Sequence, residues 1–281
     1  MEQAEGHSAL GNRMKHNMKL NHAPFEMIKN GQKTIELRLY DEKRKNISVG
    51  DKILFTNNST NQIISTTVIN LHIFDSFDSL YEKLPLISCG YTTENVNEAR
   101  ASDMELYYSK MEQEKYGVVG IELTMDYLIR EIEKKDNKAV EGVIRACLIE
   151  YGGNHEGTAW ADPDLGRFSE IYNSEGNKYW VCEDKNGKIV GGTGIGYLNK
   201  EVCELQKMYC LPEVRGTGAA HTLMQTALEY AKKYYKSCYL ETLDNMTRAR
   251  RFYEKYGFVR VDKPVVITEH FACEVKYLKE F

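Results

Sequence analysis

A glycine-rich turn between an apolar run and a helical pattern is the part of this sequence best suited to bind a phosphate group. The apolar run covers residues 202–211, and the turn Arg215-Gly-Thr-Gly-Ala-Ala220 follows it closely. Gly216 and Gly218 allow the backbone to turn tightly and to approach a ligand. Free amides at the start of a helix form a concave donor site, and the charge of Arg215 can reach a phosphate. The turn therefore suits a pyrophosphate, although such turns are more often ordinary strand-to-helix connections.

The flanking residues predict the two elements that hold this turn. The run before it, closed by Pro212, is typical of a buried strand, and apolar residues from Leu223 to Ala231 recur with a helical period. Two other phosphate-binding motifs are excluded. The turn has no Gly-Lys-Ser/Thr ending, and the three-glycine dinucleotide spacing is missing.

These residues resemble the GNAT superfamily of acetyl-CoA-dependent N-acetyltransferases. Arg215, Gly218 and Ala220 match the family's Gln/Arg-x-x-Gly-x-Gly/Ala pyrophosphate loop. A second signature follows at the expected distance, and it consists of the strand 239–242, Asn245, Ala249 and residues 252–258. The resemblance covers about residues 128–281. It implies acetyl-CoA as cofactor, a mixed central sheet flanked by helices, and domains that often pair as homodimers.

The resemblance also implies roles for individual residues. Acetyl transfer needs a group that protonates the leaving thiolate, and Tyr253 matches the family's tyrosine; the alternative is a tyrosine packed within its helix. Backbone amides near Met208 to Cys210 would donate to the pantetheine and to the developing oxyanion. Asn245 would bind the cofactor arm, or simply cap a helix. The residues expected to bind the cofactor are Met208, Tyr209, Cys210, Arg215, Gly216, Thr217, Gly218, Ala219, Ala220 and Asn245.

Glu204 is the candidate general base because it lies on the strand that would form the acetyl site. Strand alternation places Glu204, Gln206 and Met208 on one face. Burial beside an apolar site would raise the pKa of Glu204 toward the working range. The alternative is a carboxylate that only pairs with the neighbours of Lys207 or with a tail residue.

An acceptor pocket is expected beside this strand. The polar and aromatic loop 151–168 supplies His155 and Trp160, Gln206 faces the same way as Glu204, and His270 lies in a tail that resembles the Gly-His-Phe-x-Cys ending of one GNAT group. His155 could equally lie on the surface or cap a helix.

Length and composition limit the other possibilities. A chain of 281 residues favours two domains, and a net charge of −4 with a pI near 6.0 argues against a chain-wide polyanion-binding role. No apolar run approaches membrane length and no signal peptide is recognisable, so a soluble cytoplasmic protein is expected. Seven scattered cysteines without a Cys-x-x-Cys pair indicate neither a metal site nor a disulfide framework.

The N-terminal part predicts a second domain. Residues 1–16 have no periodicity and are expected to be a disordered leader or an expression remnant. Residues 17–125 contain short strands and a few helices, which favours a small, partly closed barrel in an α+β protein of two domains. The stretch 125–128 is too short for a flexible linker, and a separate strand is expected at 129–132, at the start of the second domain, 128–281.

This unit resembles the ASCH domain, a PUA-like barrel. Matching residues are Phe25, Gly31, the string Lys33-Thr-Ile-Glu-Leu-Arg38, Gly50-Asp51, and the closing strand after Tyr116. The resemblance implies a cleft at Lys33, Glu36 and Arg38 that holds RNA or a nucleoside. Small relatives hydrolyse acetylated cytidine with a Lys, a Thr and a distant Glu, but Glu36 stands where the Thr should be. The alternative is a solvated strand face with weak ion pairs.

Together these patterns predict an N-acetyltransferase that moves acetyl from acetyl-CoA to a primary amine of a small molecule by direct attack in a ternary complex. The barrel would be an accessory RNA- or nucleoside-binding module. Two alternatives are an RNA- or nucleoside-directed acetyl-group enzyme and a non-catalytic regulator that binds acetyl-CoA and RNA.

Overall fold

The computed structural model describes residues 13–265 and 272–281. Contacts divide the chain into unit 1, Met1–Leu128, and unit 2, Ile129–Phe281. Both units combine strands with helices, so the α+β class is confirmed. Among the described residues, no helix has both the length and the apolar character needed to cross a membrane.

Unit 1 is a sheet with short helices. Its strands are β1 (Lys15–Leu20), β2 (Ile35–Leu39), β3 (Lys52–Asn57), β4 (Ile63–Phe74) and the first part of β5 (Val118–Glu131). Its helices are α1 (His22–Lys29), α2 (Phe77–Lys83), α3 (Lys110–Tyr116) and the 3-10 turns η1 (Val96–Glu98) and η2 (Ala101–Leu106). The strand order is β1-β3-β4-β5-β2, with β1 parallel to β3 and with β2 antiparallel to β5.

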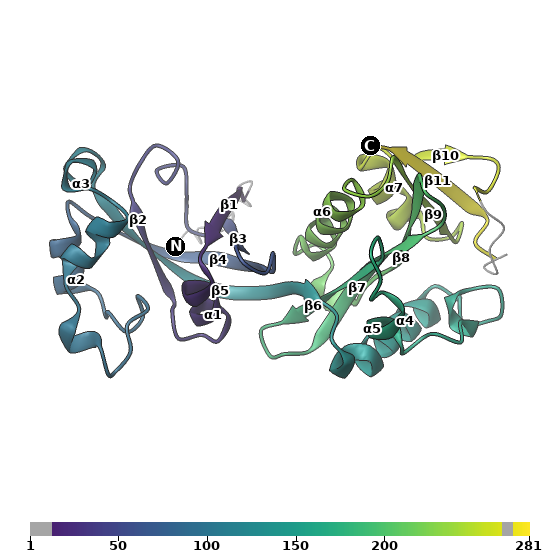
Figure 1. Cartoon of the computed structure of the whole chain (residues 1–281), viewed down its shortest axis with the longest axis horizontal. Helices are drawn as coiled ribbons and strands as arrows, with labels where there is room; N and C mark the ends of the chain where they lie inside the picture. Colours follow the sequence, from purple (N-terminus) through teal and green to yellow (C-terminus); the bar gives the residue numbers. More distant parts are fainter. Residues whose placement is uncertain (1–12, 266–271) are drawn as a thin grey trace, which may run out of the picture. The chain divides into compact units, whose positions relative to one another are not determined.

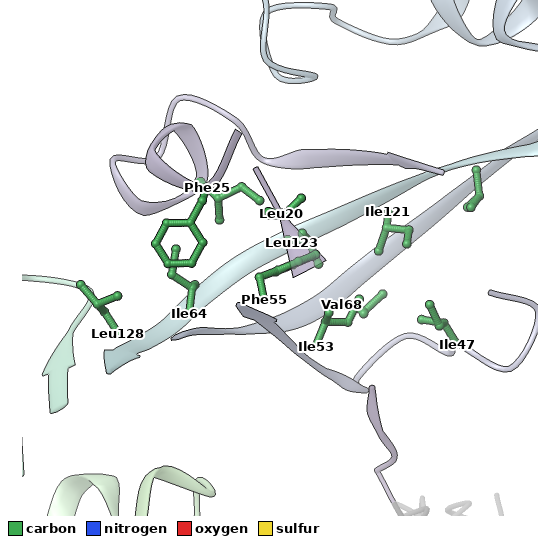
Figure 2. Packing of buried hydrophobic residues seen from close by; sticks show 12 residues of the cluster. Leu20, Phe25, Ile47, Ile53, Phe55, Ile64, Val68, Ile121, Leu123 and Leu128 are labelled. Atoms are coloured by element: carbon green, nitrogen blue, oxygen red, sulfur yellow. The ribbon is translucent and has the colours of Figure 1, made fainter. Parts of the chain in front are cut away.

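Alternating apolar residues of these strands build the core of unit 1. Phe25 of α1 packs in one cluster with side chains of β3, β4 and β5, including Phe55 and Ile64 (Figure 2). A second cluster holds Ile35, Leu37 and Leu39 of β2 against α2. Since β2 buries this face, its other face is left for Glu36 and Arg38.

The leader predicted at residues 1–16 is too long by its last two residues. Lys15 and His16 belong to β1, because they pair with Lys52 and Ile53 of β3. The carboxylate of Asp51 fixes this start, since it accepts hydrogen bonds from the backbone of Met14 and from the His16 ring, both at 2.9 Å. Residues 1–12 of the predicted leader lie outside the described residues.

The separate strand expected at residues 129–132 is wrong, because the strand before it continues through residues 125–128. A single strand, β5, runs from Val118 to Glu131. Residues 125–131 contain neither Gly nor Pro, and Tyr127, Leu128 and Ile129 are buried. Tyr127 and Ile129 favour a strand, and Asp126, whose residue type favours turns, accepts hydrogen bonds from the hydroxyls of Ser65 and Thr67 on β4.

Unit 2 is a mixed sheet with helices. Its strands are the end of β5, then β6 (Lys178–Asp184), β7 (Ile189–Tyr197), β8 (Val202–Cys210), β9 (Ser237–Thr242), β10 (Val259–Val261) and β11 (Val275–Glu280), in the order β5-β6-β7-β8-β9-β11-β10. Its helices are α4 (Asn137–Glu150), α5 (Phe168–Ile171), α6 (Ala219–Ala231), α7 (Thr247–Lys255) and the turns η3 (Lys134–Asp136), η4 (Ala159–Ala161) and η5 (Pro212–Val214).

Strand β7 lies inside this sheet, between β6 and β8. Residues 189–196 are all buried, because α4 and α6 both contact the strand. Figure 1 shows these two helices on opposite sides of strands β6, β7 and β8. The apolar residues of α6, among them Leu223, Ala227 and Leu228, face the sheet as their helical period predicts.

Candidate active site

The candidate site lies where β8 and β9 separate. Their parallel pairing covers only Val202–Glu204 against Ser237–Tyr239. Beyond this point a cavity of about 60 Å³ opens between the strands. It is lined by Leu148, Thr158, Ala159, Glu204, Leu205, Gln206, Lys207, Met208, Tyr209, Glu241, Thr242, Leu243, Met246, Tyr253 and Cys273.

A β-bulge at Lys207 shapes this cavity. Gly192 pairs with Tyr209 and Gly194 with Gln206, so two residues of β8 lie opposite one of β7. Lys207 takes a left-handed backbone with φ +51°, which costs free energy for a residue with a side chain. The bulge corrects the predicted face of Glu204, Gln206 and Met208, because the regular alternation ends after Gln206.

Two contacts hold the bulge in place. The backbone carbonyl of Lys207 accepts a hydrogen bond of 3.1 Å from the Tyr179 hydroxyl. The Lys207 ammonium forms an ion pair of 2.8 Å with Asp162, and both side chains are largely buried. Because both the backbone and the side chain of Lys207 are held, the bulge fixes the direction of the neighbouring β8 side chains.

Glu204 and Gln206 lie together on β8, as the alternation predicts. The Gln206 amide donates a hydrogen bond of 2.5 Å to the Glu204 carboxylate, and the Tyr172 hydroxyl donates one of 2.7 Å to the amide oxygen. Burial raises the pKa of Glu204 and the charge of Glu241 raises it further, which outweighs the lowering by Gln206 and Lys207. Glu204 thus accepts a proton more readily than an exposed glutamate does.

Tyr253 of α7 lines the same cavity. Its ring packs against Phe258 and Tyr277, so this tyrosine also contributes to the packing of the domain. Burial raises the pKa of Tyr253, and the neighbouring Cys210 and Cys273 add to the effect. The phenol therefore keeps its proton at neutral pH.

The predicted phosphate-binding turn leads directly into α6. Gly216 and Gly218 have φ of +81° and +99°, and Gly218 is the residue before the first helical turn. The first amides of a helix have no intrahelical acceptor, so this end remains a donor site. Arg215 donates to both oxygens of Glu150 at 2.5 and 2.6 Å and to the carbonyl of Cys210 at 2.9 Å. Its guanidinium is thus engaged by α4.

Several other candidate residues lie away from the cavity lining. Asn245 is exposed and donates a hydrogen bond of 2.8 Å to the carbonyl of Tyr151. His155 is exposed and contacts the carbonyl of Glu156. Trp160 packs its ring against the Arg145 guanidinium at 4.7 Å. Of loop 151–168, Thr158 and Ala159 line the cavity instead, because Thr158 is anchored by hydrogen bonds to two carbonyls of the loop. His270 lies outside the described residues.

Sequence reasoning missed three residues that belong to this site. Lys207 carries the bulge, but nothing in its neighbours signals a left-handed backbone. Glu241 was visible in the strand signature 239–242 without a role of its own. Tyr172 follows α5 and reaches Gln206 across the fold, and only the tertiary structure brings them together.

Unit 1 contains a separate cleft of about 490 Å³ at the polar face of β2. Glu36 is 3% exposed and forms ion pairs with Lys33 at 3.2 Å and with Arg38 at 2.8 Å. The solvated-face alternative is therefore wrong, because the central carboxylate is buried. Among the described residues, the buried Arg38 Nε has no hydrogen-bond partner. Such a donor is costly unless a ligand or water satisfies it.

Tyrosines form the wall of this cleft. Tyr108 accepts a hydrogen bond of 3.3 Å from Arg38, and Tyr81, Tyr91 and Tyr107 also line the cavity. Tyr81 and Tyr91 share a hydrogen bond of 2.9 Å, and Tyr91 donates another to Asp103. The cleft thus combines a fixed charge cluster with aromatic faces.

Comparison with known families finds a match in each unit. Residues 145–258 match the Acetyltransferase (GNAT) family, and residues 18–125 match the ASCH domain. The uncharacterized N-acetyltransferase YjgM of Escherichia coli is 40% identical over 158 residues, which are 54% of this chain and 94% of that protein. An uncharacterized N-acetyltransferase of Archaeoglobus fulgidus is 28% identical over 44% of this chain and 88% of its own length.

A solved structure agrees at the level of the fold. An acetyltransferase of the GNAT family from Staphylococcus aureus superposes with a TM-score of 0.50 at 21% identity, covering 55% of this chain and 98% of that chain. The two family matches and the Escherichia coli relative confirm both resemblances found in the sequence. The chain therefore belongs to the GNAT family of N-acetyltransferases, with acetyl-CoA as its cofactor, and carries an ASCH domain before the acetyltransferase domain.

Proposed function

We propose that unit 2 transfers acetyl from acetyl-CoA to a primary amine of a small molecule by direct attack within a ternary complex. One observation carries the proposal. Glu204 and Tyr253, the candidate base and acid, line a single cavity at the point where β8 and β9 part. A proton acceptor and a proton donor on one cavity are what amine attack on a thioester requires.

The residues around the cavity fit the cofactor. Acetyl-CoA supplies an acetyl group activated as a thioester. The glycines at 216 and 218 give the loop its left-handed turns, and the start of α6 offers amides to a pyrophosphate. Strand β8 beyond Glu204 is unpaired toward β9, so its backbone can contact a pantetheine arm. Because Arg215 is engaged by Glu150, we assign anion binding chiefly to the amides.

Each side chain then has a defined task. Glu204, with its raised pKa, would remove a proton from the acceptor ammonium directly or through a water. Tyr253 would hold its proton until the thiolate leaves and then donate it or a hydrogen bond. Tyr209 and Met208 would position the acetyl group from the bulged part of β8.

The lining of the cavity favours a cationic acceptor. Glu204 and Glu241 contribute carboxylates to the lining, and the charge of Lys207 is balanced by its ion pair with Asp162. A cavity of about 60 Å³ has room for the reacting end of an acceptor, such as a primary ammonium group. The carboxylates support a primary amine as the acceptor.

The test is a thiol-release assay with acetyl-CoA against amines, polyamines, amino acids, nucleosides and total RNA. We expect turnover with a small amine, and we expect Tyr253→Phe to lower kcat about 100-fold while acetyl-CoA still binds. Tyr234→Phe, an exposed tyrosine in the turn after α6, is the matched control. If no small acceptor causes thiol release although acetyl-CoA binds, the proposal is overturned. RNA would then be the next acceptor to test.

We further propose that unit 1 holds RNA or a nucleoside in its tyrosine-lined cleft. The charges of Lys33 and Arg38 and the aromatic faces support this assignment, since bases stack on aromatic rings. An RNA- or nucleoside-directed acetyl-group enzyme remains the second candidate, and the same observation favours it. If RNA becomes acetylated in the thiol-release assay and small amines do not, the second candidate is favoured over the first.

A further inference from the structure

The carboxylate of Glu204 is held by a chain of two hydrogen bonds that begins outside its own strand. Tyr172, which follows α5, donates to Gln206, and Gln206 donates to Glu204 at 2.5 Å. Tyr172 is 6% exposed and its ring packs against Phe168 and Tyr179. Tyr172, at the far end of this hydrogen-bond series, is therefore held rigidly.

The chemistry of the three groups sets the direction of these bonds. A carboxylate only accepts, so the amide must turn its nitrogen toward Glu204. Its oxygen then faces Tyr172, which has a hydroxyl proton to give. If the amide rotated by half a turn, its oxygen would face the carboxylate and the bond to Glu204 would be lost.

Two glycines of β7 make room for this chain. A Cβ at Gly196 would overlap the amide oxygen of Gln206, and one at Gly194 would lie 2.8 Å from Cε1 of Tyr172. Their partners in the sheet register are Glu204 and Gln206 themselves. Gly196 thus leaves room for the side chain of Gln206 on β8, and Gly194 leaves room for the ring of Tyr172.

We infer that Tyr172 and Gln206 are positioning residues that keep Glu204 charged and aimed at the acceptor amine. The inference rests on the proposed function of Glu204 as base. The bond from Gln206 favours the charged carboxylate, so losing it makes Glu204 a base only at higher pH. Tyr172 acts through Gln206 and does not contact the reacting atoms.

Other titratable groups act on Glu204 and must stay constant in the test. Lys207 is its neighbour on β8, and the others come from β9 and from the segment before β11. They are Cys238, Tyr239, Glu241 and Cys273. Tyr172→Phe and Gln206→Met change none of these residues.

The first measurement is the pH profile of kcat/KM in the intact chain. In Tyr172→Phe and Gln206→Met we expect kcat/KM to fall about tenfold near about pH 6 and to approach the wild type near about pH 9, because a hydrogen bond to a charged group is lost. Gly196→Ala should give the same shift by displacing Gln206. Tyr197→Phe, an exposed tyrosine of β7, is the matched control with an unchanged profile.

The second measurement needs no substrate. Both tryptophans, Trp160 and Trp180, lie in unit 2, so their fluorescence follows its unfolding. Relative to the wild type, the free energy of unfolding of Tyr172→Phe should fall as the pH rises. The reason is that ionising Glu204 costs more free energy in the folded state of this variant. In a Glu204→Gln background the effect of Tyr172→Phe should not depend on pH.

The outcomes distinguish the positioning role of Tyr172 and Gln206 from the role of Glu204 as base. An inactive Glu204→Gln variant, with unmoved pH profiles and pH-independent stability effects in Tyr172→Phe and Gln206→Met, would overturn the positioning role. A fully active Glu204→Gln variant would overturn the base instead, while the stability measurement would still decide whether Tyr172 controls the charge of Glu204.

Discussion

The guanidinium of Arg130 lies buried near the start of unit 2 and joins three of its elements. It donates to both oxygens of Asp136, at 2.7 and 2.9 Å, and to Glu183 of β6 at 2.8 Å. Asp136 is 4% exposed and precedes α4. The cluster thus fixes where α4 leaves the sheet, and α4 supplies Leu148 to the active-site cavity.

We predict that Asp136→Asn destabilises unit 2 by about 3 kcal/mol at neutral pH, because a buried Arg130 loses a charged partner. Burial alone would raise the pKa of Asp136, but Arg130 and the backbone amide of Glu133 outweigh it and lower the pKa. The charged form therefore adds stability above the unfolded pKa of about 3.9, and this stability is lost as the pH falls through the lower folded pKa.

Denaturant unfolding followed by tryptophan fluorescence measures this effect in unit 2. The difference between wild type and Asp136→Asn should be largest near about pH 7 and shrink toward about pH 2.5. Lys135, an exposed neighbour paired with Glu133, provides the control variant Lys135→Met, for which only a small change is expected across this range. A constant difference for Asp136→Asn across this range would contradict the assigned charge.

At the scale of elements, two glycines in neighbouring elements should respond in opposite directions to the same methyl group. Gly142 lies inside α4, and a Cβ there would meet nothing within 4 Å. Gly192 lies inside β7, and a Cβ there would lie 2.7 Å from the Tyr179 ring and 2.9 Å from the carbonyl of Trp180.

We expect Gly142→Ala to stabilise unit 2 by about 0.5–1 kcal/mol, because alanine loses less conformational entropy in a helix. Gly192→Ala should destabilise it by about 1–3 kcal/mol or more, since backbone cannot move aside easily. Thermal unfolding of the two variants beside the wild type measures both changes. Equal effects of the same sign would show that packing around β7 is looser than these distances imply.

Sequence patterns predict these elements well where periodicity and turn residues coincide. The bounds of β8 agree closely with the run predicted at residues 202–211, which Pro212 closes, and α6 ends at Ala231 as its helical period predicts. The continuity of β5 and the bulge at Lys207 were not predictable, because no local residue type distinguishes them. Of the site, Glu204 and Gln206 were predicted as neighbours from alternation, whereas Tyr172 joins them only because its ring packs beside Gly194 of β7.

At the scale of the whole molecule, each unit has its own core and its own cavity. The chain carries a net charge of −4, which gives RNA little general attraction. Any affinity for RNA must then come from a local site. In the cleft of unit 1, Glu36 neutralises part of the charge of Lys33 and Arg38, so the cluster retains a net charge of about one positive unit.

We therefore predict that the cleft binds RNA or a nucleoside mainly by stacking, with at most about one phosphate contact. The logarithm of the association constant for a short single-stranded RNA should fall with the logarithm of the salt concentration, with a slope no steeper than about −0.7. A nucleoside should bind with almost no salt dependence.

The variants Arg38→Met and Tyr108→Ala should each weaken binding about tenfold or more. The variant Lys45→Met, which changes an exposed lysine of the same unit paired with Glu42, should not weaken it. Calorimetric titration at several salt concentrations measures both quantities. A slope equivalent to several phosphates, insensitive to Arg38 and Tyr108, would mean that RNA binds elsewhere on the chain and that the buried charge cluster serves only the fold of unit 1.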